Sequence, residues 1–296
     1  MRYIGVREAA EKWNVSERSV RNYCSAGRIV GAALEGKTWK IPETAEKPGR
    51  KKRRGKIETD LLTRLEQEKE AGVPGGIYHR IQIELTYNSN HIEGSRLTHD
   101  QTRRIFETNT IGAADGDINV DDIVETANHF RCIDLIIDSA NYALSEAFIK
   151  QLHLVLKTGT SDSRKTWFAV GDYKRLENEV GGKETAKPDE VGSAMKTLLK
   201  KYNLAKGKSL EEIMEFHYEF EKIHPFQDGN GRIGRLIMFK ECLRNGIVPF
   251  IIEDGIKEYY YRGLKEWKNE RGYLLDTCLT AQDRFKEYLN YFGLQR

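Results

Sequence analysis

The residues with the clearest chemical potential lie together in the stretch HPFQDGNGRIGR, residues 224–235. Its Gly-Asn-Gly run opens a helical pattern, and the first turn of a helix offers unpaired backbone N–H groups and a positive dipole end to an anion. Glycine also lets a phosphate come close to the backbone, because it carries no side chain. The sequence therefore predicts a phosphate-binding turn at Gly229, Asn230 and Gly231.

Side chains around this turn supply further chemistry. Arg232 and Arg235 are three residues apart on the expected helix, so both guanidinium groups should project the same way and bind phosphate oxygens. Asp228 is the kind of carboxylate that holds Mg²⁺ together with substrate phosphates. His224 can take a proton near neutral pH. Together these groups predict a transfer reaction on a nucleoside triphosphate, since core packing explains such concentrated charge poorly.

The stretch resembles the Fic-domain signature HPF-x-(D/E)-GNGR-x-x-R at every fixed position. This resemblance implies the all-helical Fic fold over residues 60–290 and transfer of AMP from ATP to a protein Tyr, Thr or Ser hydroxyl, with Mg²⁺ as the metal. It also implies a role for each residue: His224 deprotonates the target, Asp228 holds Mg²⁺ on the α- and β-phosphates, Gly229, Asn230 and Gly231 line the anion hole, Arg232 clamps the departing phosphates, Arg235 binds the γ-phosphate, and Phe226 anchors the loop.

A second motif, SNHIEG at residues 89–94, resembles the Fic inhibitory motif (S/T)-x-x-x-E-(G/N). The resemblance implies a brake made by Ser89, Glu93 and Gly94: the Glu93 carboxylate pairs with Arg235 and occupies the fork that must receive the γ-phosphate. The plain alternative is a helix-terminal glutamate followed by a C-capping glycine. The sequence leaves open whether AMP addition dominates or whether Glu93 activates water and removes AMP from targets.

These motifs need a body that positions them, and the sequence after Lys56 shows helical periods with little proline. SLEE at residues 209–212 predicts a capping box. Helices are expected over residues 77–93, 98–109, 119–138, 145–157, 189–204, 209–223 and 230–244, with two more before the C-terminus.

One segment of this body, residues 171–190, departs from the helical pattern, because its glycine pair suits an exposed hairpin. In the Fic family such a hairpin is the flap, which pairs with the target as an added strand, and residues 178–188 are the candidate. The preceding GDYKR resembles the family's G-x-Y-R element with Lys174 where arginine is common, so no role is assigned to Lys174.

Near the N-terminus, GAALEGKT at residues 31–38 matches the P-loop pattern letter for letter. A P-loop needs a buried strand before its first glycine and a helix at its lysine. Here a surface helix precedes, and the prolines of WKIPETAEKP prevent the helix that should follow. We therefore expect two short strands around Glu35 and Gly36 and no nucleotide site.

Two short helices precede this hairpin, over residues 6–12 and 17–28, with Ser16 as the N-cap of the second. The second helix presents arginine and asparagine outward. The segment resembles winged helix-turn-helix DNA-binding domains of the excisionase and MerR-like type, with the hairpin as the wing. This resemblance gives the candidate DNA contacts Arg18, Arg21, Asn22, Arg28 and Lys37.

The predicted organisation is a winged helix-turn-helix domain over residues 1–46, a basic linker over 47–59, and a Fic domain over 60–296 that contains the inhibitory helix 77–94. The fold class is mainly α, with a small hairpin flap. The run GRKKRRGK carries six positive charges in eight positions, and a solvated linker and a phosphate-contacting arm explain it equally well.

Composition limits the partners. The net charge of +3 is too small to imply nucleic-acid binding by itself, so DNA binding rests locally on residues 1–56. No apolar run reaches the length of a membrane helix, and we expect a cytoplasmic protein without a membrane partner. The four separated cysteines predict reduced thiols. A protein target with a hydroxyl side chain is expected, and a homodimer is left open.

The leading prediction is an autoinhibited, Mg²⁺-dependent protein adenylyltransferase, able also to modify itself, joined to a DNA-binding module. One alternative is a Fic enzyme that uses another nucleoside triphosphate or transfers a phosphoryl group. Another is a transcription regulator whose Fic body serves as a nucleotide sensor. The complete catalytic set disfavours the sensor, because a sensor has no use for His224.

Overall fold

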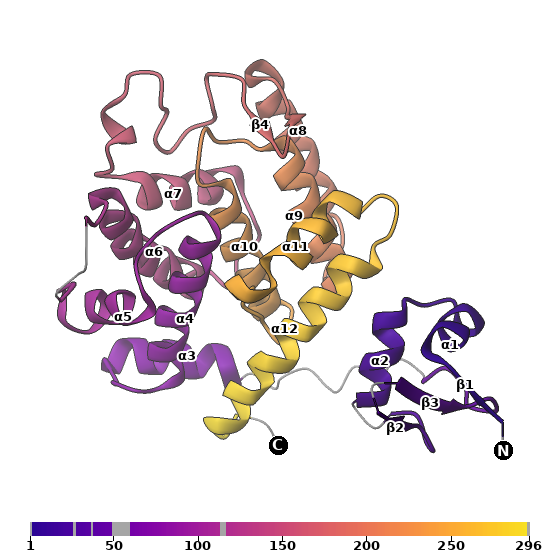
Figure 1. Ribbon diagram of the computed structural model, residues 1–296. Helices are drawn as coiled ribbons and strands as arrows, with labels where there is room; N and C mark the ends of the chain where they lie inside the picture. The colour runs from indigo at the N-terminus through magenta and orange to yellow at the C-terminus, as the bar shows by residue number, and fades with distance from the viewer. Residues whose placement is uncertain (1, 26–27, 37, 49–59, 113–116, 295–296) are drawn as a thin grey trace. The chain divides into compact units, whose positions relative to one another are not determined.

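The computed structural model describes residues 2–25, 28–36, 38–48, 60–112 and 117–294. The chain divides into two compact units, Met1–Gly55 and Lys56–Arg296 (Figure 1). Each unit encloses hydrophobic residues of its own.

The smaller unit combines two helices with a small antiparallel sheet. Helices α1 (Val6–Trp13) and α2 (Glu17–Ser25) contact each other, and α1 also contacts β3 (Thr38–Pro42). The Ser16 hydroxyl accepts a hydrogen bond from the Ser19 N–H at 3.1 Å, so the predicted N-cap is confirmed. The helix ends at Ser25, before the predicted residue 28, and residues 26–27 lie outside the described part.

The predicted hairpin between residues 33 and 42 is confirmed. Strand β2 (Ala33–Glu35) pairs antiparallel with β3, with Leu34 opposite Trp39, and the chain turns through Gly36 at a φ of 63°. Strand β1 (Tyr3–Ile4), which the sequence did not predict, adds to the other edge of β3 in the order β1-β3-β2. The lysine position of the P-loop pattern is thus followed by a strand rather than a helix.

The larger unit is helical, as predicted. Its helices are α3 (Asp60–Ala71), α4 (Ile77–Ile92), α5 (His99–Thr108), α6 (Val120–Asp138), α7 (Glu146–Lys157), α8 (Pro188–Asn203), α9 (Leu210–Ile223), α10 (Asn230–Arg244), α11 (Lys257–Glu266) and α12 (Gly272–Tyr291), with short 3₁₀ turns at Asp162–Arg164 and Asp254–Ile256. Helix α3 was not among the ranges predicted from the sequence. The predicted capping box of α9 is present, with Glu212 N–H bonded to the Ser209 hydroxyl at 3.1 Å. A hairpin of β4 (Glu179–Val180) and β5 (Lys183–Glu184) interrupts the helices where it was expected.

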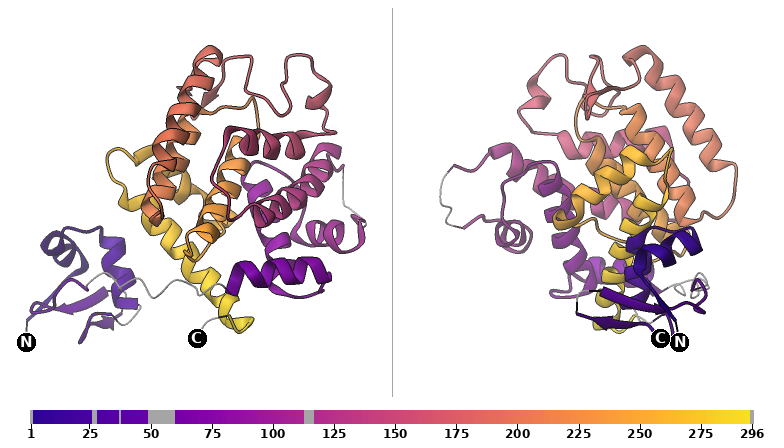
Figure 2. Two further views of the ribbon diagram at one scale, coloured as in Figure 1. Left: turned by 180° about the vertical axis from the view of Figure 1, so that it is seen from behind. Right: turned by 45° about the vertical axis from the view of Figure 1, so that its right-hand side comes forward.

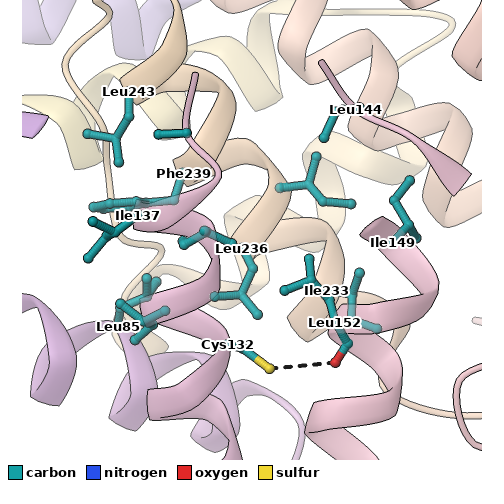
Figure 3. Packing of buried hydrophobic residues seen from close by; sticks show 14 of the residues in the cluster. Leu85, Cys132, Ile137, Leu144, Ile149, Leu152, Ile233, Leu236, Phe239 and Leu243 are labelled. Atoms are coloured by element: carbon teal, nitrogen blue, oxygen red, sulfur yellow. Dashed lines mark hydrogen bonds between the residues drawn. The ribbon is translucent and has the colours of Figure 1, made fainter. Parts of the chain in front are cut away.

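Helix α10 is the centre of this unit (Figures 1 and 2). It contacts α4, α6, α7 and α9, and most of its residues are buried on every side, which is the pattern of a core helix. Figure 3 shows its side chains Ile233, Leu236 and Phe239 packed among residues of the surrounding helices, with Leu85 and Leu152 among them. Because α10 is fixed along its length, its N-terminal turn is a rigid platform.

Two further features bear on the sequence predictions. Cys24, Cys132, Cys242 and Cys278 are free and buried, as expected for reduced thiols. Among the described residues, none of the helices is both long and apolar enough to cross a membrane.

Candidate functional site

The candidate site lies where α9 ends and α10 begins. His224, directly after α9, takes a left-handed conformation with φ 51° and ψ 64°, which is rare for a residue with a side chain and is common at functional sites. Asn230 closes the loop from inside: its side chain accepts a bond from Phe226 N–H at 2.9 Å and donates one to Phe226 O at 2.8 Å. Gly229, at φ 82°, then leads the chain into α10.

One aromatic stack fixes this loop to the core. Phe226 is fully buried and stacks on the His153 ring with centroids 4.1 Å apart and planes 6° apart. His153 also accepts a hydrogen bond from the Gly171 N–H at 2.9 Å. Phe226 thus lies in the core, where the sequence placed it. The buried side chain of Asn230 holds the loop, so only its backbone is left to serve an anion.

His224 is held as a neutral base. Its Nδ1 lies 3.3 Å from the carbonyl oxygen of Glu221. Since a carbonyl can only accept, Nδ1 carries the proton and Nε2 is left to accept another. Burial lowers the pKa of His224 to about 4, so the ring is uncharged at neutral pH. Burial and the neighbouring Glu93 also raise the pKa of Glu221 to about 8.

Arg235 is held by the end of α4. Its Nη2 donates to Glu93 Oε1 at 2.7 Å and to the carbonyl oxygen of Ser89 at 2.9 Å, and its Nε lies 3.0 Å from Ser89 Oγ. The guanidinium is almost fully buried, whereas the Glu93 side chain is about one-third exposed. The expected contact between Glu93 and Arg235 is therefore present in the structure. Gly94 follows with a φ of 97°, which favours glycine.

Glu93 also lies against the first turn of α10. A Cβ atom at Gly231 would collide with Glu93 Oε1 and would lie 3.0 Å from Arg235 Nη1. The carboxylate thus fills the space beside the helix N-terminus, where the dipole and the unpaired N–H groups favour negative charge. A phosphate at this turn and the Glu93 carboxylate would compete for the same place.

Arg232 lies in a second, separate network. Its Nη1 binds Glu125 of α6, and its Nη2 lies 3.1 Å from Asp228 Oδ2. Lys157, at the end of α7, is buried and binds Glu125, Asp228 Oδ2 at 2.7 Å and Asp162 Oδ2 at 3.0 Å. The two arginines, expected to form a common pair of forks, are thus held by carboxylates of different helices.

Asp228 suits a magnesium ligand. Burial acts to raise its pKa, but Arg232 and Lys157 outweigh it and hold the pKa well below the usual range, so the carboxylate is ionised. Its side chain is about half exposed. A single accessible carboxylate is what Mg²⁺ combines with substrate phosphates.

Sequence reasoning missed Glu125 and Lys157. A signal existed for the lysine: it continues the buried stripe of Ile149 and His153 at intervals of four residues, where a charged side chain needs a partner. Glu125 gave no comparable signal, since its partners lie 32 and 107 residues away in the chain.

The hairpin β4–β5 lies next to the loop of His224. Leu176 N–H binds the side-chain oxygen of Gln227 at 3.2 Å, and Asn178 Nδ2 donates to Phe226 O at 3.1 Å. The residues of β4 are exposed. The predicted flap is thus joined to the candidate site by its base.

The candidate DNA contacts lie in the smaller unit. Arg18, Arg21 and Asn22 are exposed on α2, with Arg21 paired to Glu17 at 2.7 Å. Arg28 is half-buried, with its guanidinium 4.9 Å from the centre of the Tyr23 ring. Lys37 and the whole basic run at 49–56 lie outside the described residues.

Comparisons with known proteins find a likeness to the Fic family. Residues 143–242 match the model of the Fic/DOC family. The protein adenylyltransferase Fic of Drosophila grimshawi is 30% identical over 187 residues, which cover 60% of this chain and 36% of that protein. The chain therefore spans about a third of the length of this curated relative.

Solved structures extend the likeness over most of the chain. A Fic domain containing signaling protein from Bacteroides thetaiotaomicron is 27% identical with a TM-score of 0.58, covering 78% of this chain and 90% of that one. A segment of Fic-1 from C. elegans has a TM-score of 0.60 at 18% identity, covering 80% of this chain and 73% of that one, and shares the fold. The predicted helical Fic fold is confirmed.

Proposed function

Given that residues 143–242 match the Fic family, we propose that this chain transfers AMP from ATP to a Tyr, Thr or Ser hydroxyl of a protein and is inhibited by its own Glu93. The observation that supports this most strongly is the contact between Glu93 and Arg235 beside the first turn of α10. A carboxylate of the chain itself beside this turn supports the proposal that the turn receives a phosphate.

In the proposed reaction, the backbone of α10 and two arginines bind the triphosphate. The N–H groups of its first turn receive phosphate oxygens. Arg235 binds the γ-phosphate once Glu93 has moved away, which sets the α-phosphorus in line for attack. Arg232 lies on the same helix near Asp228 and stabilises the charge that develops on the departing pyrophosphate. Mg²⁺ on Asp228 would neutralise charge on the phosphates.

His224 supplies the base. With Nδ1 donating to the backbone, Nε2 takes the proton of the target hydroxyl, whose oxygen forms a bond to the α-phosphorus as the bond to the pyrophosphate breaks. The low pKa of His224 keeps Nε2 free of a proton before the reaction, while Nδ1 stays protonated.

The inhibited state follows from competition for Arg235. A buried guanidinium that already binds a carboxylate loses that partner when a phosphate takes it, so the two anions exclude each other. A coupling free energy of about 1–3 kcal/mol between two ligands corresponds to about 5–150-fold in binding affinity, here in the affinity of Arg235 for the γ-phosphate. We therefore expect Glu93→Gly to raise transfer by an amount in this range.

The test uses ATP labelled either at the α- or at the γ-phosphorus, with wild type, Glu93→Gly and the matched control Glu93→Gln. Label from the α-position should enter protein, including the enzyme itself, most strongly with Glu93→Gly. Equal labelling by wild type and Glu93→Gly would refute the brake, and transfer of the γ-label would indicate phosphoryl transfer. Silence of all three proteins would favour the nucleotide sensor.

A second proposal concerns the smaller unit, which we propose binds DNA. Two short helices with exposed Arg18, Arg21 and Asn22 on the second, beside a hairpin, fit a helix in the major groove with a wing. Binding should weaken steeply as salt rises, because it releases counterions. Absence of binding to promoter fragments below about 200 mM salt would indicate a protein-interaction module instead.

A further inference from the structure

Lys174 is a buried cation surrounded by neutral oxygen atoms. Its side chain is 3% exposed, and its Nζ lies 2.6 Å from Asn178 Oδ1, 2.6 Å from Thr185 Oγ1 and 3.5 Å from the carbonyl oxygen of Ile223. An ammonium has three donors, so all three oxygens can be bound at once. Burial lowers its pKa to about 8, which is the cost of holding the charge there. Because burial of a lysine costs free energy, we expect its contacts to give Lys174 a specific role.

The first two partners are the two ends of the exposed hairpin. Asn178 immediately precedes β4, and Thr185 immediately follows β5. The Thr185 hydroxyl also contacts Asn178, with its Oγ1 2.9 Å from Asn178 O and 2.6 Å from Asn178 Oδ1. Lys174 therefore holds the two ends of the hairpin together through hydrogen bonds to Asn178 and Thr185.

The other contacts fasten the same base to the loop of His224. Lys174 N–H donates to Pro225 O at 2.9 Å, Nζ reaches Ile223 O, and Asn178 Nδ2 donates to Phe226 O. These carbonyl groups belong to the residue directly before His224 and to the two residues after it. A few direct hydrogen bonds thus connect the hairpin to the loop that carries His224.

We propose that Lys174 is a positioning residue that sets the distance between an acceptor strand on the hairpin and Nε2 of His224. The proposal rests on the proposed function and adds the part that handles the acceptor. A hydroxyl must lie about 3 Å from the base that takes its proton. A displacement of about 1 Å can cost about 10²-fold in rate. A hairpin free to tilt on its base would place the hydroxyl that poorly.

The test compares Lys174→Met with Lys222→Met, both in the Glu93→Gly background of the full chain. Lys222 is an exposed lysine near the end of α9, two residues before His224, so its removal controls for the loss of a lysine beside the loop. The charge of Lys174 also lowers the pKa of His224, and Lys174→Arg, which keeps that charge, controls for this effect. Self-labelling with ATP labelled at the α-phosphorus should fall by about 10²-fold in Lys174→Met and stay unchanged in Lys222→Met. The Kd of Mg–ATP should remain equal in both, because Lys174 acts on the acceptor.

Hydrogen exchange separates this role from a general loss of stability. Amides of residues 178–186 should exchange faster in Lys174→Met, while those of α10 keep their rates. Lys174→Arg, which retains charge and donors, should keep much of the labelling. Thr185→Val removes one partner of Nζ and should give a smaller loss, so the proposal stays testable if Lys174→Met fails to fold.

Three results would overturn the proposal: labelling by Lys174→Met equal to that of Lys222→Met, a parallel loss of Mg–ATP affinity, or unchanged exchange in the hairpin. If the Glu93→Gly parent transfers no AMP at all, the proposed function fails. The exchange measurement then still decides whether Lys174 joins the hairpin to the loop of His224.

Discussion

Two stretches of this chain carry glycines beside cations in the manner of a nucleotide site, and their surroundings differ completely. In GAALEGKT, Gly36 reverses the chain between two strands that bond to each other. In DGNGRIGR, Gly229 leads into α10, a buried helix of 15 residues. In a hairpin, backbone N–H groups form hydrogen bonds between the two strands, whereas the N–H groups of the first turn of a helix have no partner within the helix. The element that follows the glycines, more than their spacing, decides whether an anion can bind.

The side chains beside the two stretches reinforce the contrast. At the start of α10, Arg232 and Arg235 are buried and each is already bound to carboxylates. Around Gly36, the residues Leu34, Glu35 and Thr38 are exposed. Buried charge is costly unless it is paired, so a cluster of it marks a place with a purpose beyond packing.

The largest effect is expected from loss of His224, the proposed general base. Replacing His224 by Ala should reduce AMP transfer by about 10²–10⁴-fold in the Glu93→Gly background, because no other group at the loop is placed to take the proton. Nucleotide affinity should change little. The measurement is labelling with α-labelled ATP beside a binding titration. Full labelling without His224 would mean that the base is elsewhere.

A smaller effect is expected from two matched glycine substitutions. Gly231→Ala puts a Cβ where Glu93 and Arg235 now lie and where a phosphate would approach, so Mg–ATP affinity should fall about tenfold even in the Glu93→Gly background. Gly36→Ala should leave ATP affinity unchanged and destabilise only the smaller unit, by about 1 kcal/mol, because its φ is 63°. Loss of ATP affinity in Gly36→Ala would break the contrast.

Acid should separate the units that carry the two stretches. Burial lowers the pKa values of His129, His153 and His217 to about 3 from 6.5, so the folded state stays neutral while the unfolded state takes up protons. The contribution of each histidine to the free energy of unfolding is complete above pH 6.5. It decreases by about 1.4 kcal/mol per pH unit as the pH falls from 6.5 toward the pKa of the folded state.

All seven histidines lie in residues 79–224, so the smaller unit lacks this source of acid sensitivity. Urea unfolding followed at pH 7 and pH 5 should show the transition of the larger unit moving to lower urea. A transition of the larger unit that does not move would contradict the buried, neutral state of these histidines.

The smallest effect is expected at the lysine of the P-loop pattern. Lys37→Ala should leave both ATP affinity and AMP transfer unchanged. If the smaller unit binds DNA, Lys37→Ala should weaken DNA binding modestly. It should also reduce the slope of the logarithm of the binding constant against the logarithm of salt concentration by about 1. A titration with Mg–ATP and one with DNA at several salt concentrations give both answers. Weaker ATP binding would restore the P-loop interpretation.

Local signals made much of this fold predictable. The capping box at Ser209 and the glycine before Asn230 indicated where α9 and α10 start, because both signals depend on residues within a few positions of each other. The hairpin at Gly36 followed from prolines and strand-forming residues in the same way. The contact of Glu93 with Arg235 came from the family resemblance rather than from any local rule.

The features that the sequence did not reveal depend on distant pairings. Strand β1 has two residues and exists only because it pairs with β3, nearly forty positions away. Glu125 meets Lys157 and Arg232 only after three helices have packed. The clamp at Lys174 joins a hairpin to a loop about fifty residues later. Pairings of this kind leave no period or cap in the sequence.

The central claim, that nucleotide binds at the start of α10 and not at residues 31–38, can be tested by hydrogen exchange of the full chain with and without Mg–ATP. The amides of residues 230–232 should exchange rapidly without ligand and slow down when phosphate oxygens accept from them. The slowing should be stronger in Glu93→Gly than in wild type, because Arg235 is then free to bind phosphate. Protection by Mg–ATP at residues 31–38, with none at 230–232, would contradict the account.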